Sequence, residues 1–326
     1  MNVAIVGCGL IGKKRFKALG PKHRLAATAD TNLALAQELA RQSPGATAVQ
    51  DWHQILEQKN VEIVIVATPN QWLAPIALAA IEAGKHVLVE KPGGRSPQEI
   101  KPMIAAAQRQ RVCVHVGYNH RFHPAANQAR QIIDSGALGP LLMIRGRYGH
   151  GGRLGYEREW RADPEMAGGG ELIDQGVHLI DLARWFLGDL SLAYGWANTY
   201  FWKMNVEDNA FLMLQTPSKQ AAWLHVSCSE WKNLFSLEIY GAQGKLHLEG
   251  LGGSYGTEQL VYYKMLPQMG PPETTNWDYP GDDVSWKLEF EAFVRAVSVQ
   301  GPAPVTLQDA NAILEIVQEV YRSRVA

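Results

Sequence analysis

The sequence predicts an α/β protein of two domains. A doubly wound parallel sheet is expected in residues 1–118, and an α+β domain with a large, mostly antiparallel open sheet flanked by helices in residues 119–326. The chain has 326 residues, which is more than one core usually holds. Up to Gly117, short apolar segments alternate with helical ones, as in parallel βαβ units. After residue 192, strand-length segments follow one another with turn residues between them.

The first domain is expected to consist of short apolar strands joined by helices. The strands are predicted at 2–6, 24–29, 61–67, 86–90 and 112–117, with a weaker one near 46–49. The helices are predicted near 11–20, 32–42, 71–83 and 97–109. A strand, a helix and a second strand in this order form a right-handed crossover, so these elements predict one parallel sheet.

The second domain is expected to begin with a helix near 124–135, a strand near 141–149 and a helix near 172–187. Further strands are predicted near 192–202, 208–216, 220–229, 234–240, 245–249 and 259–264. The proline- and glycine-rich segment 267–285 predicts one long surface loop. Two amphipathic helices close the chain, and the last could pack back on the first domain. Thr306-Leu307-Gln308-Asp309 predicts a capping box, with Asp in place of Glu, at its start.

Composition excludes several classes of protein. Apolar residues make up 46% and charged residues 19%, as in globular proteins with a full core. A net charge of −1 gives no reason to expect nucleic acid or a membrane surface as partner. Cys8, Cys113 and Cys228 form no metal-ligand cluster, which argues against zinc and against a disulfide scaffold. The chain shows no signal-peptide pattern and no apolar run of about 20 residues, so we expect a cytoplasmic protein.

Large aromatic residues are frequent in the expected second sheet. They include Trp196, Tyr200, Trp202, Trp223, Trp231, Tyr240, Tyr262 and Tyr263. Such side chains can simply pack within a sheet, but an uncovered apolar face marks a subunit interface. We therefore expect a homodimer or homotetramer formed through this sheet.

Gly7-Cys8-Gly9-Leu10-Ile11-Gly12 follows the first strand and opens the first helix. In this context the pattern indicates a Rossmann dinucleotide site: Gly7 allows the tight turn, Gly9 the approach of a pyrophosphate, and Gly12 close helix packing. The helix N-terminus attracts that anion. The second strand ends at Asp30, which would bind ribose hydroxyls and repel a 2′-phosphate, so we expect NAD rather than NADP. Asp30 could instead cap the following helix.

Glu90-Lys91-Pro92 ends the apolar strand 86–90. The carboxyl ends of strands in open α/β sheets are where ligands bind, and Pro92 prevents the strand from continuing. Lys91 could donate a hydrogen bond to a substrate oxygen or move protons there. A solvated lysine at a strand end is the alternative.

Asp174 and His178 stand four residues apart in one expected helix, so their side chains share a face. A histidine can take a proton near neutral pH, and a neighbouring carboxylate can orient it. Asp181 is a competing partner for His178, and a half-buried helix with a satisfied histidine is the alternative. The preceding Gly168-Gly169-Gly170 would let the backbone pass close to a ligand.

Together these motifs resemble the Gfo/Idh/MocA family of sugar and cyclitol dehydrogenases. The matching segments are 4–9, 67–70, 83–92, 170–174, 178–181 and the closing helices from Phe290 to Ser323. The resemblance implies that His178 is the general acid/base, that Lys91 binds the reacting oxygen, and that Asp174 orients the substrate or His178. It also implies cofactor contacts from Gly7, Gly9, Leu10, Ile11, Gly12, Asp30, Thr68, Pro69, Asn70, Glu90 and Lys91. Members often have a histidine where this chain has Leu73, which puts a polar contact from that position in doubt.

The implied reaction is hydride transfer between nicotinamide and a carbinol carbon of a sugar. Side chains that could hold an anionic sugar (a sugar nucleotide, sugar phosphate or uronate) are Arg145, Arg147, His150, Arg153, Tyr156, Arg158, Trp160 and Arg161. A solvated loop balanced by Glu157, Glu159 and Asp163 is an equal alternative. We also expect Tyr118, Asn119 and Arg121 near the cofactor or the substrate.

Two other functions stay open. Some proteins of this kind sense a dinucleotide or sugar without catalysis, but these can lose the lysine or the histidine. This chain retains Lys91 and His178, which favours an enzyme. Within enzymes, reduction of a non-sugar carbonyl or imine is the other possibility.

Overall fold

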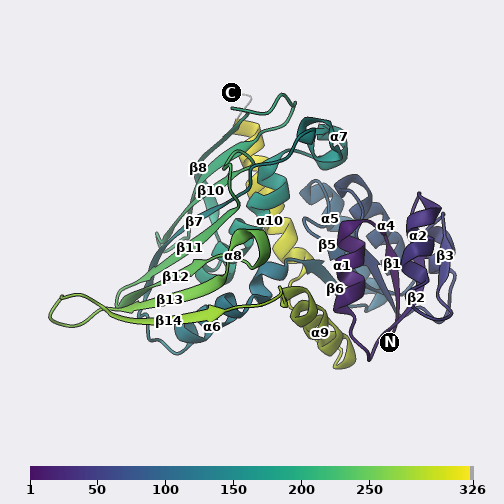
Figure 1. The fold of residues 1–326 in the computed structure, drawn as a ribbon, viewed down its shortest axis with the longest axis horizontal. Coiled ribbons are helices and arrows are strands. Elements are labelled where there is room, and N and C mark those ends of the chain that lie inside the picture. Colours follow the sequence, from purple (N-terminus) through teal and green to yellow (C-terminus); the bar gives the residue numbers. More distant parts are fainter. Residues whose placement is uncertain (324–326) are drawn as a thin grey trace. The chain divides into compact units, whose positions relative to one another are not determined.

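The computed structural model describes residues 1–323 and divides into two compact units. The first unit comprises residues 1–118, 165–168 and 286–314; the second comprises 119–164, 169–285 and the segment that starts at Glu315. Figure 1 labels most elements of both. The sequence predicts a continuous second domain from residue 119, whereas residues 165–168 and 286–314 belong to the first unit.

The first unit contains a six-stranded sheet in the order β3-β2-β1-β4-β5-β6, with every pair parallel. Its strands are β1 (Asn2–Val6), β2 (Arg24–Ala29), β3 (Thr47–Val49), β4 (Ile63–Val66), β5 (His86–Glu90) and β6 (Val114–Gly117). Its helices between these strands are α1 (Leu10–Ala18), α2 (Leu33–Ala40), α3 (His53–Leu56), α4 (Asn70–Glu82) and α5 (Pro97–Gln110). The strand order reverses between β1 and β4, which is where doubly wound sheets bind dinucleotides. Only α3, a single turn, was not predicted.

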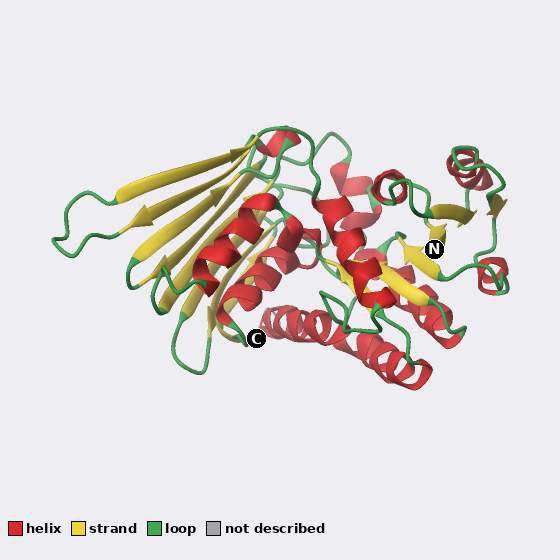
Figure 2. Cartoon of the chain, turned by 90° about the horizontal axis from the view of Figure 1, so that it is seen from below, coloured by secondary structure: helices red, strands yellow, loops and turns green. Residues whose placement is uncertain are grey.

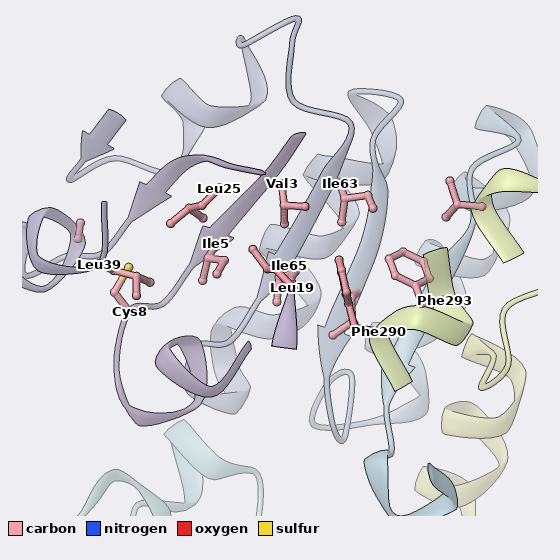
Figure 3. Packing of buried hydrophobic residues seen from close by; sticks show 13 residues of the cluster. Val3, Ile5, Cys8, Leu19, Leu25, Leu39, Ile63, Ile65, Phe290 and Phe293 are labelled. Carbon is pink, nitrogen blue, oxygen red and sulfur yellow. The ribbon is translucent and has the colours of Figure 1, made fainter. Parts of the chain in front are cut away.

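The core of this unit includes side chains from the far end of the sequence. Val3 and Ile5 of β1 pack in one buried cluster with Phe290 and Phe293 of helix α9 (Ser285–Ser298) (Figure 3). Both phenylalanines are almost completely buried. The parallel sheet therefore depends on a helix that lies about 170 residues beyond its last strand in sequence.

The last helix, α10 (Leu307–Ser323), begins with the predicted capping box. The backbone N and Oγ1 of Thr306 each donate to Asp309 Oδ2 at 2.9 Å, and Asp309 N donates to Thr306 Oγ1 at 3.1 Å. The shorter Asp thus performs the function that Glu usually has at this position.

The second unit contains an eight-stranded sheet in the order β14-β13-β12-β11-β7-β10-β9-β8. Neighbouring strands are antiparallel except β7 and β10, which are parallel. The strands are β7 (Leu141–Gly149), β8 (Ser191–Asn198), β9 (Asn209–Gln215), β10 (Ala221–Ser227), β11 (Leu234–Gly241), β12 (Gly244–Glu249), β13 (Glu258–Lys264) and β14 (Glu273–Tyr279). A mostly antiparallel open sheet is as predicted.

The prediction that 267–285 is one loop was wrong, because this segment contains β14. Among the described strands it lies at the edge of the sheet and pairs with β13, from Glu258↔Tyr279 to Lys264↔Glu273. Its residues are mostly polar and exposed, so it lacks the alternation of a half-buried strand. The prolines lie in the flanking turns, where they do not interrupt the ladder.

Helices cover one face of this sheet. α6 (Pro124–Asp134) packs against β12 and β13, and α8 (Val177–Leu187) against β7 and β10 (Figures 1 and 2). Within the described part of this unit, no helix covers the opposite face. That face exposes Trp196, Met213 and Trp223, each by about two fifths of its surface.

Across residues 1–323, no helix combines the length and apolar character needed to cross a membrane.

Candidate active site

The fingerprint loop of the first unit requires glycine at two positions. A Cβ on Gly7, which has φ of +93°, would lie 2.4 Å from the carbonyl oxygen of Ala67 after β4. A Cβ on Gly12 would lie 2.0 Å from the oxygen of Gly7. At Gly9, by contrast, such an atom would meet no described residue beyond its chain neighbours within 4 Å. The loop is therefore closed against β4 on one side and open above Gly9.

Asp30 stabilises this loop through a hydrogen bond to its backbone. Its Oδ2 accepts a hydrogen bond from the backbone N of Cys8 at 2.8 Å, and its Oδ1 accepts one from Asn32 N at 2.8 Å. Helix α2 is capped by Asn32, whose side chain accepts from Ala34 N at 3.2 Å. The alternative that Asp30 is the helix cap was therefore wrong.

The residues around the loop fit a dinucleotide. The N-cap residue of α1 is Gly9, which makes no side-chain cap hydrogen bond, and Leu10 in the first turn is 74% exposed. Thr68 Oγ1 is buried without a hydrogen-bond partner in the described chain, and the backbone N of Thr68 lies 3.0 Å from the position of a Cβ on Gly7. A pyrophosphate at this helix end would meet unsatisfied N–H groups.

Other residues near the predicted cofactor site occupy different local environments. Pro69 precedes α4 at its N-cap position, and Asn70 Nδ2 donates to the carbonyl oxygen of Ala167 at 2.9 Å. Ile11 lies half-buried in the first turn of α1. Leu73 is completely buried in α4, so it occupies a core position and presents no polar group.

Glu90 is part of a buried ionic cluster that the sequence did not reveal. Arg15 of α1 is fully buried and pairs with Glu90 at 2.5 Å and with Glu289 of α9. His115 of β6 approaches Glu289 at 3.1 Å. Burial raises the pKa of Glu90. Burial also opposes ionisation of Glu289, but Arg15 and His115 stabilise its carboxylate and hold the pKa of Glu289 below its usual value. The cluster fixes the end of β5 directly before Lys91, and the carboxylate of Glu90 binds Arg15.

Lys91 is the first residue after β5, and its side chain is half-buried. The peptide bond between Lys91 and Pro92 is cis. The strand ends at Glu90, as predicted.

In the second unit, Asp174 and His178 lie on one continuous helical segment, which starts with a π-helical turn and continues as an α-helix. Asp174 belongs to a π-helical turn, η4 (Leu172–Gly176), and His178 to α8, which follows without a break. Both are buried, with 7% and 4% of their surfaces exposed. Arg161 Nε donates to Asp174 Oδ2 at 3.0 Å. Single π turns within α-helices are frequent at functional sites.

Asp181, the competing partner for His178, is engaged by an arginine. Arg121 Nε and Nη2 donate to its two carboxylate oxygens at 2.9 and 2.6 Å, and both residues are buried. Arg121, expected near the substrate, is thus one half of a buried bidentate pair. Such pairs have fixed geometry.

The glycines before Asp174 serve packing within the second unit. A Cβ on Gly169 would lie 2.0 Å from Tyr321 Oη, and one on Gly170 would lie 2.0 Å from the carbonyl oxygen of Glu207. The buried carboxylate of Glu207 accepts hydrogen bonds from Gly170 N, Leu172 N and Tyr321 Oη at 3.0, 3.2 and 2.7 Å. Glu207 therefore holds the start of η4. No local pattern in the sequence indicates this contact.

The arginine-rich segment is largely neutralised by carboxylates. The pairs are Arg145–Glu238 at 2.5 Å, Arg153–Glu159 at 2.6 Å, Arg158–Glu157 at 3.7 Å and Arg161–Asp174 at 3.0 Å. These pairs favour the interpretation of a balanced loop over that of an anion site.

The remaining predicted substrate residues occupy different environments. Arg147 is exposed on β7, and Trp160 lies 4.5 Å from the guanidinium of Arg161. Tyr156 is buried with its ring 5.5 Å from that of Trp202. Tyr118 is completely buried, and Asn119 Nδ2 donates to Ser285 Oγ at 2.8 Å. No group of side chains within residues 1–323 is arranged to hold a metal ion.

Comparison with protein families gives matches over both units. Residues 1–118 match an oxidoreductase family with an NAD-binding Rossmann fold, and residues 126–247 match the GFO/IDH/MocA C-terminal domain. The two matches cover most of the chain.

Individual relatives act on sugars. The chain is 34% identical over 211 residues to levoglucosan dehydrogenase of Pseudarthrobacter phenanthrenivorans, covering 59% of this chain and 52% of that protein. It is 26% identical to D-glucoside 3-dehydrogenase of Escherichia coli, covering 99% and 95%. A structure of levoglucosan dehydrogenase with NADH and L-sorbose superposes with a TM-score of 0.87 at 25% identity, covering 99% and 97%. In the first of these alignments the chain spans about half the length of the relative.

Proposed function

Because the chain belongs to the Gfo/Idh/MocA oxidoreductase family, we propose that it oxidises or reduces a CH–OH group of a sugar or cyclitol with NAD. The observation that carries the proposal is a buried Asp174 and His178 on one helical segment, in a chain that also has an open fingerprint loop. The first supplies a group for proton transfer, and the second fits the dinucleotide.

Each residue of the proposed site has one task. On oxidation of the alcohol, His178 takes the hydroxyl proton, and on reduction of the carbonyl it returns that proton. Lys91 donates a hydrogen bond to the reacting oxygen. Asp174, held by Arg161, orients the substrate or His178. When bound, the nicotinamide accepts or supplies the hydride.

We propose a neutral sugar or cyclic polyol as substrate, in place of the anionic sugar expected from the sequence. Four of the five arginines that suggested an anion, all except Arg147, are paired with Glu238, Glu159, Glu157 and Asp174. An anionic substrate would have to compete with these carboxylates for the guanidinium groups. The names of the relatives, which include levoglucosan and D-glucoside dehydrogenases, support the same choice.

A substrate panel tests this proposal. We expect NADH to form with neutral compounds such as levoglucosan, inositol or a methyl glucoside. For matched glucuronates, sugar phosphates and sugar nucleotides we expect kcat/KM to be lower by about tenfold or more. NADH absorbance measures the rate, with NADP as the control cofactor. An equal or higher kcat/KM for the anionic members would contradict the neutral substrate. NADH binding without turnover of any member would instead indicate a sensor.

We further propose that the uncovered face of the second sheet pairs with another copy of the chain. Aromatic rings continue across its strands: Trp196 stacks on Phe211 at 4.8 Å, and Phe211 stacks on His225 at 4.2 Å. Trp223 lies on the same face, opposite Met213 of the neighbouring strand. A contiguous apolar face of this kind favours association.

Light scattering after size-exclusion chromatography measures the oligomeric state. We expect a dimer or tetramer for the wild type and a smaller species for Trp223→Glu, because a charge would be buried in the interface. Met269→Glu, on an exposed loop residue, is the control and should keep the wild-type mass. A monomeric wild type would contradict the proposal.

A further inference from the structure

A second histidine lies face to face with His178. The ring centroids of His120 and His178 are 3.8 Å apart, and the ring planes are inclined by 25°. His120 belongs to the short helix η1 (Asn119–Phe122), and only 6% of its surface is exposed. The ring of Tyr148 lies 5.2 Å from that of His120 and 6.1 Å from that of His178. His178 thus packs within an aromatic group, and its flat face rests on one member of that group.

A chain of hydrogen bonds fixes the orientation of His120. Ser285 Oγ lies 2.5 Å from Asp283 Oδ1, and a carboxylate only accepts, so the serine hydroxyl donates to it. Ser285 Oγ must then accept from Asn119, whose Nδ2 lies 2.8 Å away. The oxygen of the Asn119 amide consequently faces His120 Nδ1 at 3.2 Å. Since that oxygen is an acceptor, Nδ1 of His120 carries the hydrogen.

Charged residues close in sequence to the two histidines have partners. The pairs are Arg121 with Asp181, Arg161 with Asp174, and His123 with Glu258, whose atoms lie 2.8 Å apart. The hydrogen bonds that connect Asp283, Ser285, Asn119 and His120 therefore help to orient the His120 ring.

We propose that His120 is a positioning residue for His178: its neutral ring, protonated on Nδ1, holds the plane of the His178 imidazole for proton transfer. This inference rests on the proposed function. During alcohol oxidation His178 becomes an imidazolium, and a neutral aromatic ring lying against its face attracts that charge. A second positive charge on His120 at this separation would repel it.

Two substitutions of His120 distinguish the loss of ring stacking on His178 from a change of the side chain that keeps a flat ring. His120→Ala removes the ring, and we expect kcat to fall about tenfold to a hundredfold because the acid/base group loses its orientation. KM and the Kd for NADH should change much less than kcat. His120→Phe keeps a flat neutral ring and should restore most of the wild-type kcat. His53→Ala is the matched control, because His53 also stacks on a ring, that of Trp52 at 3.7 Å, but is exposed on the first unit.

The outcomes distinguish this inference from the proposed function. If His120→Ala kept wild-type kcat, or if His120→Phe were as slow as His120→Ala, the stacking proposal would be wrong. If His178→Ala itself kept wild-type kcat on the same substrate, the acid/base assignment would fail instead. Should His120→Ala not fold, as judged by Tm and NADH binding, His120→Leu replaces it as the variant without a ring.

Nitrogen NMR of the full-length protein tests the tautomer without any substrate. In protein labelled with ¹⁵N-histidine, the signals that disappear in His120→Phe belong to His120. We expect them to show hydrogen on Nδ1 and none on Nε2 at neutral pH. The opposite tautomer would overturn the hydrogen-bond chain that carries the proposal, and an imidazolium at that pH would overturn the neutral ring that the proposal requires.

Discussion

Replacing His178 with alanine should lower kcat at least about a hundredfold, the lower bound for the loss of a general acid/base. Lys91→Ala should have an effect of similar size, because the reacting oxygen loses its hydrogen-bond donor. His178 is not among the residues expected to contact the cofactor, so the Kd of His178→Ala for NADH should stay within about threefold of the wild type, a difference of less than about 1 kcal/mol. Steady-state kinetics on the best substrate and a fluorescence titration with NADH give the two quantities.

The control for this experiment is Lys59→Ala, which removes an exposed lysine of the first unit. It should match the wild type in both measurements. Near-normal turnover of both His178→Ala and Lys91→Ala would remove the proposed site, whereas loss of NADH binding would show that the substitutions act on the fold or the cofactor.

Arg15→Met should lower the free energy of unfolding of the first unit by about 3–5 kcal/mol, as expected when one partner of a buried ion pair is removed. Arg15 is the cation between Glu90 and Glu289, and without it two carboxylates would stay buried close together. Thermal and denaturant unfolding, followed by circular dichroism, measure the change.

A surface pair provides the matched control. Lys13 lies in the same helix and pairs with Glu38, but both side chains are well exposed. Lys13→Met should therefore cost less than about 1 kcal/mol. The triple variant R15M/E90Q/E289Q, which removes all three charges, should recover much of the loss. If Arg15→Met and Lys13→Met had the same free energy of unfolding, the buried ion pairs of Arg15 would not contribute the expected stability.

Features encoded by neighbouring residues could be predicted from the sequence. The fingerprint glycines, the strand ending at Glu90 and the capping box at Thr306 each depend on a few consecutive positions, and all have the expected local structure. The helix that carries Asp174 and His178 was also predicted, since its apolar period is strong. Its π turn was not predicted, because one extra residue in a single turn hardly changes the spacing of the apolar residues.

Contacts between distant segments could not be predicted in this way. The two partners of Arg15, Glu90 and Glu289, lie 75 and 274 residues away on two different elements, and no sequence period relates them. Glu207 contacts Gly170 and Tyr321, which lie 37 and 114 residues away in sequence. The stack of His120 on His178 had one indication, the two histidines of Asn119-His120-Arg121-Phe122-His123. A histidine pattern alone does not tell which ring it will meet.

The first unit is discontinuous in sequence, which has a consequence for its synthesis. Phe290, Phe293 and Val297 complete the core around β1 and β4, yet they leave the ribosome more than 200 residues after those strands. Until then the nascent strands expose the apolar surface that α9 will cover. The dinucleotide-binding half therefore cannot finish folding ahead of the rest of the chain, although its sheet is made first. A fragment ending at Tyr118 lacks part of its own core, and the natural unit of folding is close to the whole polypeptide.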